Sequence, residues 1–189
     1  MENASPKGKK TTFFTVYDIT YIAMSIALIT LCSWITVPST VPFTMQTFAI
    51  FAIVALFGVT RATAATLIYL LLGALGAPIF SGFNGGFGYL LGSTGGYLIG
   101  FVFASLVTGL MIKFLGNKTF IMFISMVSGL VVCYAIGTAY FMLIYTKNSG
   151  PVALTSVFLW CVAPFIVPDL LKILLALFTA KRFSKFVKN

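Results

Sequence analysis

The stretch from 157 to 178, VFLWCVAPFIVPDLLKILLALF, places two charged residues inside a long apolar run. Asp169 and Lys172 lie three residues apart, so their side chains share one face if the stretch is helical. A charge at membrane depth costs at least roughly 2.5–3.5 kcal/mol, and such residues usually pair, face the protein interior and serve a ligand or an ion path. Asp169 and Lys172 are therefore the first candidates for a functional site.

The rest of the chain is equally apolar. Of its 189 residues, 60% are hydrophobic and 8% are charged, and the mean hydropathy is +1.08. A soluble domain carries roughly 25% charged residues, so lipid must surround most of this chain. The expected fold is all-α: a single polytopic bundle of six transmembrane helices over 15–182, between basic cytoplasmic tails at 1–14 and 183–189. The expected helices are at 17–37, 43–59, 62–80, 88–115, 119–146 and 152–180.

The distribution of lysine and arginine predicts the orientation. If the amino terminus is cytoplasmic, ten of these residues lie on the inner side and Lys147 alone lies on the outer side. Both termini are therefore expected in the cytoplasm. The cations sit at the ends of apolar segments and form no continuous patch, so a nucleic-acid partner is not expected.

Several chemistries are excluded by missing residue types. The chain has no histidine, and its three cysteines lie inside apolar segments without a CxxC spacing. Disulfide frameworks, metal sites and Ser/His or Cys/His catalysis are therefore not expected. The protein is therefore not expected to be an enzyme. No P-loop motif is present, so it is expected to have no ATPase site of its own, and no cofactor is expected.

Small residues recur at helical spacing in two segments. Gly92, Gly96, Gly100 and Ala104 follow one another every fourth residue, which predicts close packing of two helix backbones. Ala23 and Ala27 form a shorter stripe in the first segment. That stripe could pack inside the bundle, or it could dock on another membrane protein.

Pro168 adds to the candidate site. It has no N–H, so it leaves the carbonyl of Pro164 without its helical donor and predicts a kink. A free acceptor beside a carboxylate and an ammonium would form a polar pocket in an apolar surrounding. A small solute with an amide-like or urea-like head would suit such a pocket. In the alternative interpretation, the ion pair merely neutralises itself.

Four motifs in order resemble the BioY family: VPFTMQTF (41–48), Arg61, YLLLGALGAPIFSGFNGGFGYLLGSTGGYLIGF (69–101) and PDLLK (168–172). Members of that family are the biotin-binding S components of energy-coupling-factor (ECF) vitamin transporters. The resemblance implies a six-helix S component in a bacterial plasma membrane, with biotin bound near the outer side. It also implies a transmembrane coupling (T) protein and two cytoplasmic ATPases as partners, with Ala23 and Ala27 docking on the T protein.

Biotin, as the implied ligand, suggests roles for individual residues. Asp169 would accept hydrogen bonds from the N–H groups of the ureido ring. Lys172 would donate either to the ureido oxygen or to the valerate carboxylate. The further candidates are Asn84 as donor and acceptor, Gln46 and Thr44 in a lid, and Tyr89 and Tyr97 as apolar walls.

Two other functions fit the residues. A stand-alone secondary transporter could use Asp169 as a proton relay. A membrane scaffold would bind no solute at all. The first of these predicts uptake by the protein alone, driven by a proton gradient, whereas a capture subunit predicts tight binding without one.

Overall fold

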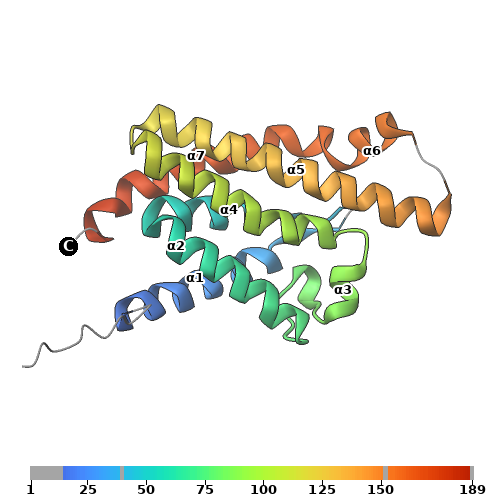
Figure 1. Cartoon of the computed structure of the whole chain (residues 1–189), viewed down its shortest axis with the longest axis horizontal. Coiled ribbons are helices and arrows are strands. Elements are labelled where there is room, and N and C mark those ends of the chain that lie inside the picture. The colour runs from blue at the N-terminus through green and yellow to red at the C-terminus, as the bar shows by residue number, and fades with distance from the viewer. Residues whose placement is uncertain (1–14, 39–40, 151–152, 188–189) are drawn as a thin grey trace, which may run out of the picture.

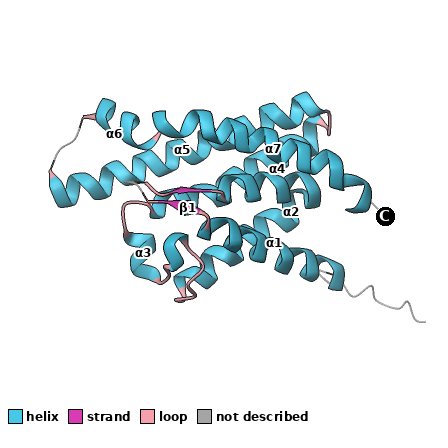
Figure 2. Cartoon of the chain, turned by 180° about the vertical axis from the view of Figure 1, so that it is seen from behind, coloured by secondary structure: helices cyan, strands magenta, loops and turns pink. Residues whose placement is uncertain are grey.

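The computed structural model describes residues 15–38, 41–150 and 153–187, and of these it does not describe the side chains of 149 and 184–187. Helices dominate, and two short strands pair antiparallel as a hairpin between the first two long helices (Figures 1 and 2). The expected all-α fold is confirmed. The elements are α1 (Val16–Trp34), β1 (Thr36–Val37), β2 (Phe43–Thr44), α2 (Gln46–Ala74), η1 (Ser81–Phe83), α3 (Phe87–Leu91), α4 (Gly95–Leu115), α5 (Thr119–Ser149), α6 (Leu154–Cys161) and α7 (Ala163–Val187).

The helix α2 contains two of the expected segments. Its backbone leaves the helical region at Gly58, with φ of 80° and ψ of 175°, a conformation that only glycine adopts readily. On one side of this point, Arg61 pairs with Asp18 at the start of α1. Beyond the far end of α2, the carbonyl of Ile79 accepts a hydrogen bond from Ser33 near the end of α1. The chain therefore reverses at Gly58 and runs along α1 twice.

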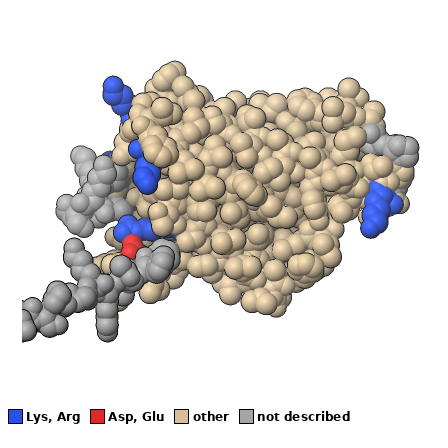
Figure 3. All heavy atoms as spheres, viewed as in Figure 1, with Lys and Arg blue, Asp and Glu red and all other residues tan. Residues whose placement is uncertain are grey.

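This reversal gives six crossings. Among the described residues, five stretches are long and apolar enough to span a membrane, the last of them formed by α6 and α7 together, and α2 counts twice because it folds back. The long helices lie side by side, and α1 begins at the same end of the bundle at which α7 ends (Figure 1). Lysine and arginine atoms gather at that end and in a smaller group at the opposite end, with an uncharged band between them (Figure 3). This distribution suits a multi-pass membrane protein.

The last expected helix, 152–180, is interrupted. The backbone at Val162 has φ of −126° and ψ of −55°, which separates α6 from α7. In one continuous helix, Pro164 would leave the carbonyl of Trp160 without a donor, whereas in the first turn of α7 its missing N–H has no such cost. The sequence placed the kink at Pro168. Pro168 lies within α7, so a kink there stays a prediction, whereas the interruption at Val162 was not expected from the sequence.

The expected helix 88–115 is also divided, because a tight turn separates α3 from α4. A Cβ on Gly95 would lie 1.8 Å from the carbonyl oxygen of Leu90, so the turn excludes a side chain there. Gly92 lies in this turn and does not belong to the small-residue stripe of α4.

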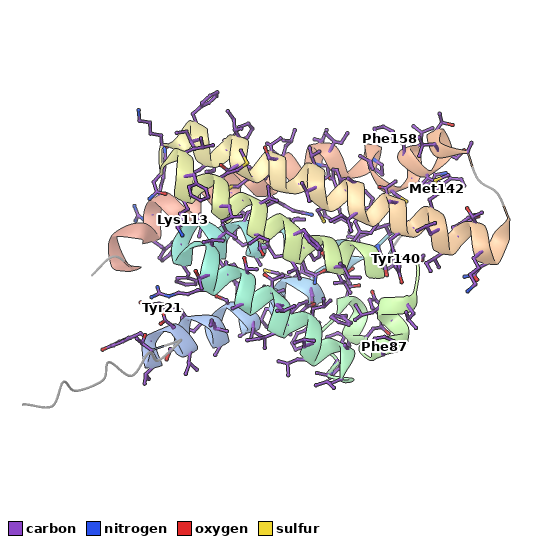
Figure 4. The ribbon with its side chains drawn as sticks, in the orientation of Figure 1. Tyr21, Phe87, Lys113, Tyr140, Met142 and Phe158 are labelled. Carbon is purple, nitrogen blue, oxygen red and sulfur yellow. The ribbon has the colours of Figure 1, made fainter. Side chains whose placement is uncertain are left out.

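The remaining small residues of α4 let neighbouring helices approach closely, as their spacing predicts. A Cβ at each glycine would crowd an atom of α5 or α2. Tyr140, labelled in Figure 4, lies on α5 directly against this stripe. At Gly96, an added Cβ would lie 2.3 Å from Cβ of Tyr140. At Gly100 it would lie 3.1 Å from the carbonyl oxygen of Cys133, and at Gly109 it would lie 2.6 Å from Cβ of Val59.

We expect Gly96→Ala to lower the stability of the bundle. The added methyl group would overlap Tyr140, and overpacking of this kind destabilises a protein by about 1–3 kcal/mol. The higher helix propensity of alanine offsets at most about 1 kcal/mol of this loss. The measurement is thermal unfolding in detergent. Gly88→Ala is the control, because a Cβ there would meet nothing within 4 Å. Equal melting temperatures for the two variants would contradict the close packing.

Candidate functional site

A pocket lies inside the bundle, lined by residues of α2, η1, α3, α4, α5, α6, α7 and the β1–β2 hairpin. Its empty volume is about 570 Å³, open solvent at its mouth included. Asp169 and Lys172 both line it. The predicted pair is therefore part of a cavity and does not face lipid.

The two charged side chains form a buried ion pair. Nζ of Lys172 lies 2.8 Å from Oδ1 of Asp169, and their side chains are 6% and 4% exposed. Both residues are on α7, one turn apart, as the spacing in the sequence predicts.

The carboxylate of Asp169 has two further donors, from two other helices. Oγ1 of Thr47 on α2 donates to Oδ1 at 3.0 Å, and the phenol of Tyr134 on α5 donates to Oδ2 at 2.5 Å. With Lys172, Oδ1 accepts two hydrogen bonds and Oδ2 accepts one. A carboxylate offers about four acceptor positions, so one position on Oδ2 remains for a ligand.

The ammonium group of Lys172 joins α7 to the hairpin. Nζ donates to the backbone carbonyl of Thr44 at 2.6 Å, and it lies 3.8 Å from the ring centroid of Phe43. Two of its three donors are thus used in hydrogen bonds, and the aromatic face provides a cation–π contact. Lys172 therefore holds β2 over the pocket in addition to pairing with Asp169.

Gln46 and Thr44 belong to one buried chain of hydrogen bonds. Thr44 donates to the side-chain carbonyl of Gln46 at 3.0 Å, and the amide of Gln46 donates to the hydroxyl of Tyr69 at 2.8 Å. Tyr69 in turn donates to the carbonyl of Ile79. Both predicted residues line the pocket, Thr44 from the hairpin and Gln46 from the first residue of α2.

Tyr89 and Tyr97 also line the pocket, where the sequence predicted walls. The hydroxyl of Tyr89 lies 2.7 Å from Oγ of Ser81, and that of Tyr97 lies 3.2 Å from Oγ1 of Thr138. These hydrogen bonds fix the orientation of both rings.

Asn84 is not brought into the pocket. Its side chain is exposed, and its amide donates to the carbonyl of Ser81 at 2.8 Å within the η1 turn. Ala23 and Ala27 are exposed on the outer face of α1, next to Met24, which is 58% exposed.

Sequence reasoning missed Thr47 and Tyr134. A buried carboxylate needs more donors than one lysine, so hydroxyl groups on other helices could have been expected. The chain has eight tyrosines, however, and no spacing relates Tyr134 to Asp169. Among the described residues, no three His, Cys, Asp or Glu side chains lie together so that they could hold a metal ion.

The fold and the pocket define a membrane-embedded protein whose interior holds a site with a buried ion pair and an open mouth. Residues 5–189 match the BioY family, and the chain belongs to that family. It is 37% identical to the biotin transporter BioY of Thermotoga maritima, over 84% of this chain and 90% of the relative. It is 33% identical to a probable biotin transporter BioY of Pyrococcus horikoshii, over 87% of this chain and 94% of that relative.

A solved structure has the same fold. It is the crystal structure of the S-component for biotin from an ECF-type ABC transporter. The TM-score is 0.80 at 25% identity, and the superposition covers 90% of this chain and 92% of the other. The fold and the sequence similarity to these relatives together show that the protein is a transporter subunit.

Removing one member of the ion pair should cost more than removing both. Lys172→Met leaves the carboxylate of Asp169 without its cation, and breaking a buried pair costs about 3–5 kcal/mol. The double variant Asp169→Leu/Lys172→Met leaves no unpaired charge and should lose less. Thermal unfolding of the ligand-free protein in detergent gives both values. Asp169→Leu alone completes the cycle, and Lys147→Met, at an exposed lysine, is the control. If the effects of Asp169→Leu and Lys172→Met simply add in the double variant, the pairing is contradicted.

Proposed function

We propose that this protein binds biotin in the pocket around Asp169 and Lys172 and delivers it across the plasma membrane as the S component of an ECF transporter. The observation that carries the proposal is the free acceptor position on Oδ2 of a buried, otherwise satisfied carboxylate. Membership of the BioY family and the names of the relatives support biotin as the solute.

The chemistry of the ureido ring suits this acceptor. The ring offers two N–H donors and one carbonyl. An N–H directed at Oδ2 of Asp169 would make a charge-assisted hydrogen bond, which is roughly twice as strong as a neutral one. Lys172 is the cation nearest to the ureido oxygen in this arrangement, and the ion pair keeps the site neutral overall.

The valerate carboxylate needs separate partners. Among the described lining residues, Lys172 is the one cation, and it already donates to Asp169 and to the carbonyl of Thr44. The hydroxyls of Ser81 and Thr94, which also line the pocket, together with backbone amides, are the groups that remain for the carboxylate. Asn84 would reach the ligand only if the η1 turn rearranged.

The orientation and the partners are part of the proposal. The lysine and arginine bias favours a cytoplasmic position for the cation-rich end of the bundle. The exposed Ala23 and Ala27 would dock α1 on a T protein, whose two attached ATPases supply the energy. Small side chains at positions i and i+4 allow the close backbone approach that such docking needs.

A proton relay is the competing role for Asp169. A relay carboxylate must exchange its proton with water or a neighbour, whereas Asp169 is held by Lys172, Thr47 and Tyr134. These three donors already occupy three of its acceptor positions, which suits a carboxylate that accepts hydrogen bonds from a ligand. Uptake by liposomes that contain this protein alone, abolished by an uncoupler, would favour the relay.

Asp169→Asn should weaken biotin binding about 10- to 150-fold, because a charged hydrogen bond contributes about 1.5–3 kcal/mol. Calorimetric titration of biotin into the purified protein, without partners, measures this. Asp18→Asn is the control, since Asp18 does not line the pocket. Unchanged affinity in Asp169→Asn would remove Asp169 from the site, whereas absence of wild-type binding would remove biotin as the ligand.

Ala23→Leu/Ala27→Leu should abolish ATP-driven uptake and leave biotin affinity unchanged, because the larger side chains keep α1 away from the T protein. Uptake is measured in cells or liposomes with the complete transporter, and affinity is measured on the isolated protein. Ala135→Leu/Ala139→Leu is a matched control, being another pair with the same spacing on α5. Full uptake by the α1 variant would show that docking occurs elsewhere.

A further inference from the structure

A second cleft lies at the end of the bundle where α1 begins. It opens between the reversal at Gly58 and the end of α4, and its empty volume is about 1,020 Å³, including the open mouth. Its lining comes from α1, α2, α4 and the connection from α4 to α5. None of its lining residues lines the pocket around Asp169.

The cleft is apolar in its depth and cationic at its rim. Val54 is 1% exposed, and Phe57 and Ile112 are partly buried, so the floor is hydrocarbon. Arg61 and Lys113 lie at the rim, where Lys113 is exposed and the Arg61 side chain is 33% exposed. An occupant that matches both zones must itself be amphipathic and negatively charged.

The guanidinium of Arg61 is positioned and only partly used. Its Nε donates to Oδ1 of Asp18 at 2.6 Å, and its central carbon lies 5.0 Å from the ring centroid of Tyr21. Within the described part of the chain, its two terminal nitrogens make no hydrogen bond. Asp18 thus balances one charge and fixes the group, while Lys113 adds a positive charge that no described carboxylate pairs with.

The rim lies at the ends of two candidate membrane spans. The candidate span of α1 begins at Val16, and that of α4 ends at Leu115, so Lys113 is in the last turn of its helix, where lipid headgroups are expected. Tyr21 and Lys113 lie toward the same end of the bundle (Figure 4), and the larger group of lysine and arginine atoms is at that end (Figure 3). Bilayer phosphates are therefore within reach of both cations.

We propose that this cleft binds an anionic phospholipid. The phosphate diester accepts hydrogen bonds from the terminal nitrogens of Arg61 and from Lys113, and one acyl chain lies on Val54, Phe57 and Ile112. Basic pockets between transmembrane helices are established sites for anionic headgroups. A soluble anion would satisfy the rim but would leave the apolar floor uncovered, which favours the lipid.

The first experiment compares Lys113→Gln with Lys147→Gln. Both lysines are exposed and lie in the last turn of a long helix, at opposite ends of the bundle, so each substitution removes the same charge and the same helix-end interaction. Arg61 is left unchanged because its removal would leave Asp18 unpaired. Delipidated protein is titrated with dioleoyl phosphatidylglycerol or dioleoyl phosphatidylcholine, and bound lipid is measured by native mass spectrometry.

Wild-type protein should bind phosphatidylglycerol more tightly than phosphatidylcholine. Lys113→Gln should lose about fivefold in affinity for phosphatidylglycerol, as expected for one cation near a membrane surface, and Lys147→Gln should lose nothing. Equal affinity of the wild type for the two lipids would overturn the proposal. Equal losses in the two variants would also overturn it, because they would indicate general attraction of the anion to a cationic protein.

Competition distinguishes the source of the phosphate. Inorganic phosphate and glycerophosphoglycerol, which lack acyl chains, should displace bound phosphatidylglycerol far less effectively than dihexanoyl phosphatidylglycerol does. Equally effective displacement by the chain-free compounds would make the cleft a site for soluble anions and would overturn the lipid assignment. Neither titration involves biotin, so the result is independent of the proposed transport function.

Discussion

The ion pair between Asp169 and Lys172 ties α2, α5 and the β1–β2 hairpin to α7. Thr47 and Tyr134 reach the carboxylate from two helices, and Lys172 holds the backbone of Thr44. Each partner offsets part of the cost of placing charge at membrane depth, so the pair is tolerated only with all of these elements in place. The contacts that stabilise the two charges therefore also bring together the elements that form the walls of the pocket.

The hydrogen bonds to Asp169 also require that the helices pack closely. Thr47 and Tyr134 can reach one carboxylate because α2, α4 and α5 pack at glycine positions. Gly129 illustrates this, since a Cβ there would lie 2.1 Å from Oγ1 of Thr108 on α4. The reversal at Gly58 serves the same end, because it returns the chain along α1 without a long connection and brings Tyr69 back to Gln46. Glycine thus sets the distances on which the polar network depends.

The sequence predicted the crossings and the charged pair because both depend on strong local signals. An apolar run of sufficient length must cross the bilayer, and Asp169 and Lys172 share a helix face at any tilt. The interruption at Val162 was missed, because whether the helix breaks before Pro164 depends on how α6 packs on its neighbours. Tyr134 and Thr47 lie 35 and 122 residues from Asp169, and only tertiary packing brings them together.

Charge balance determines which solutes the pocket accepts. Asp169 and Lys172 cancel each other, so a ligand head with a net charge would leave that charge uncompensated in a surrounding of low dielectric constant. A cyclic urea is neutral yet strongly dipolar, and it can add an N–H to Oδ2 of Asp169 without separating the pair. A protonated amine would compete with Lys172 for the same carboxylate, and an anionic head would face it directly. In the proposed site, the buried pair would therefore select a neutral donor–acceptor head and would leave any charged tail of the ligand to the mouth of the pocket.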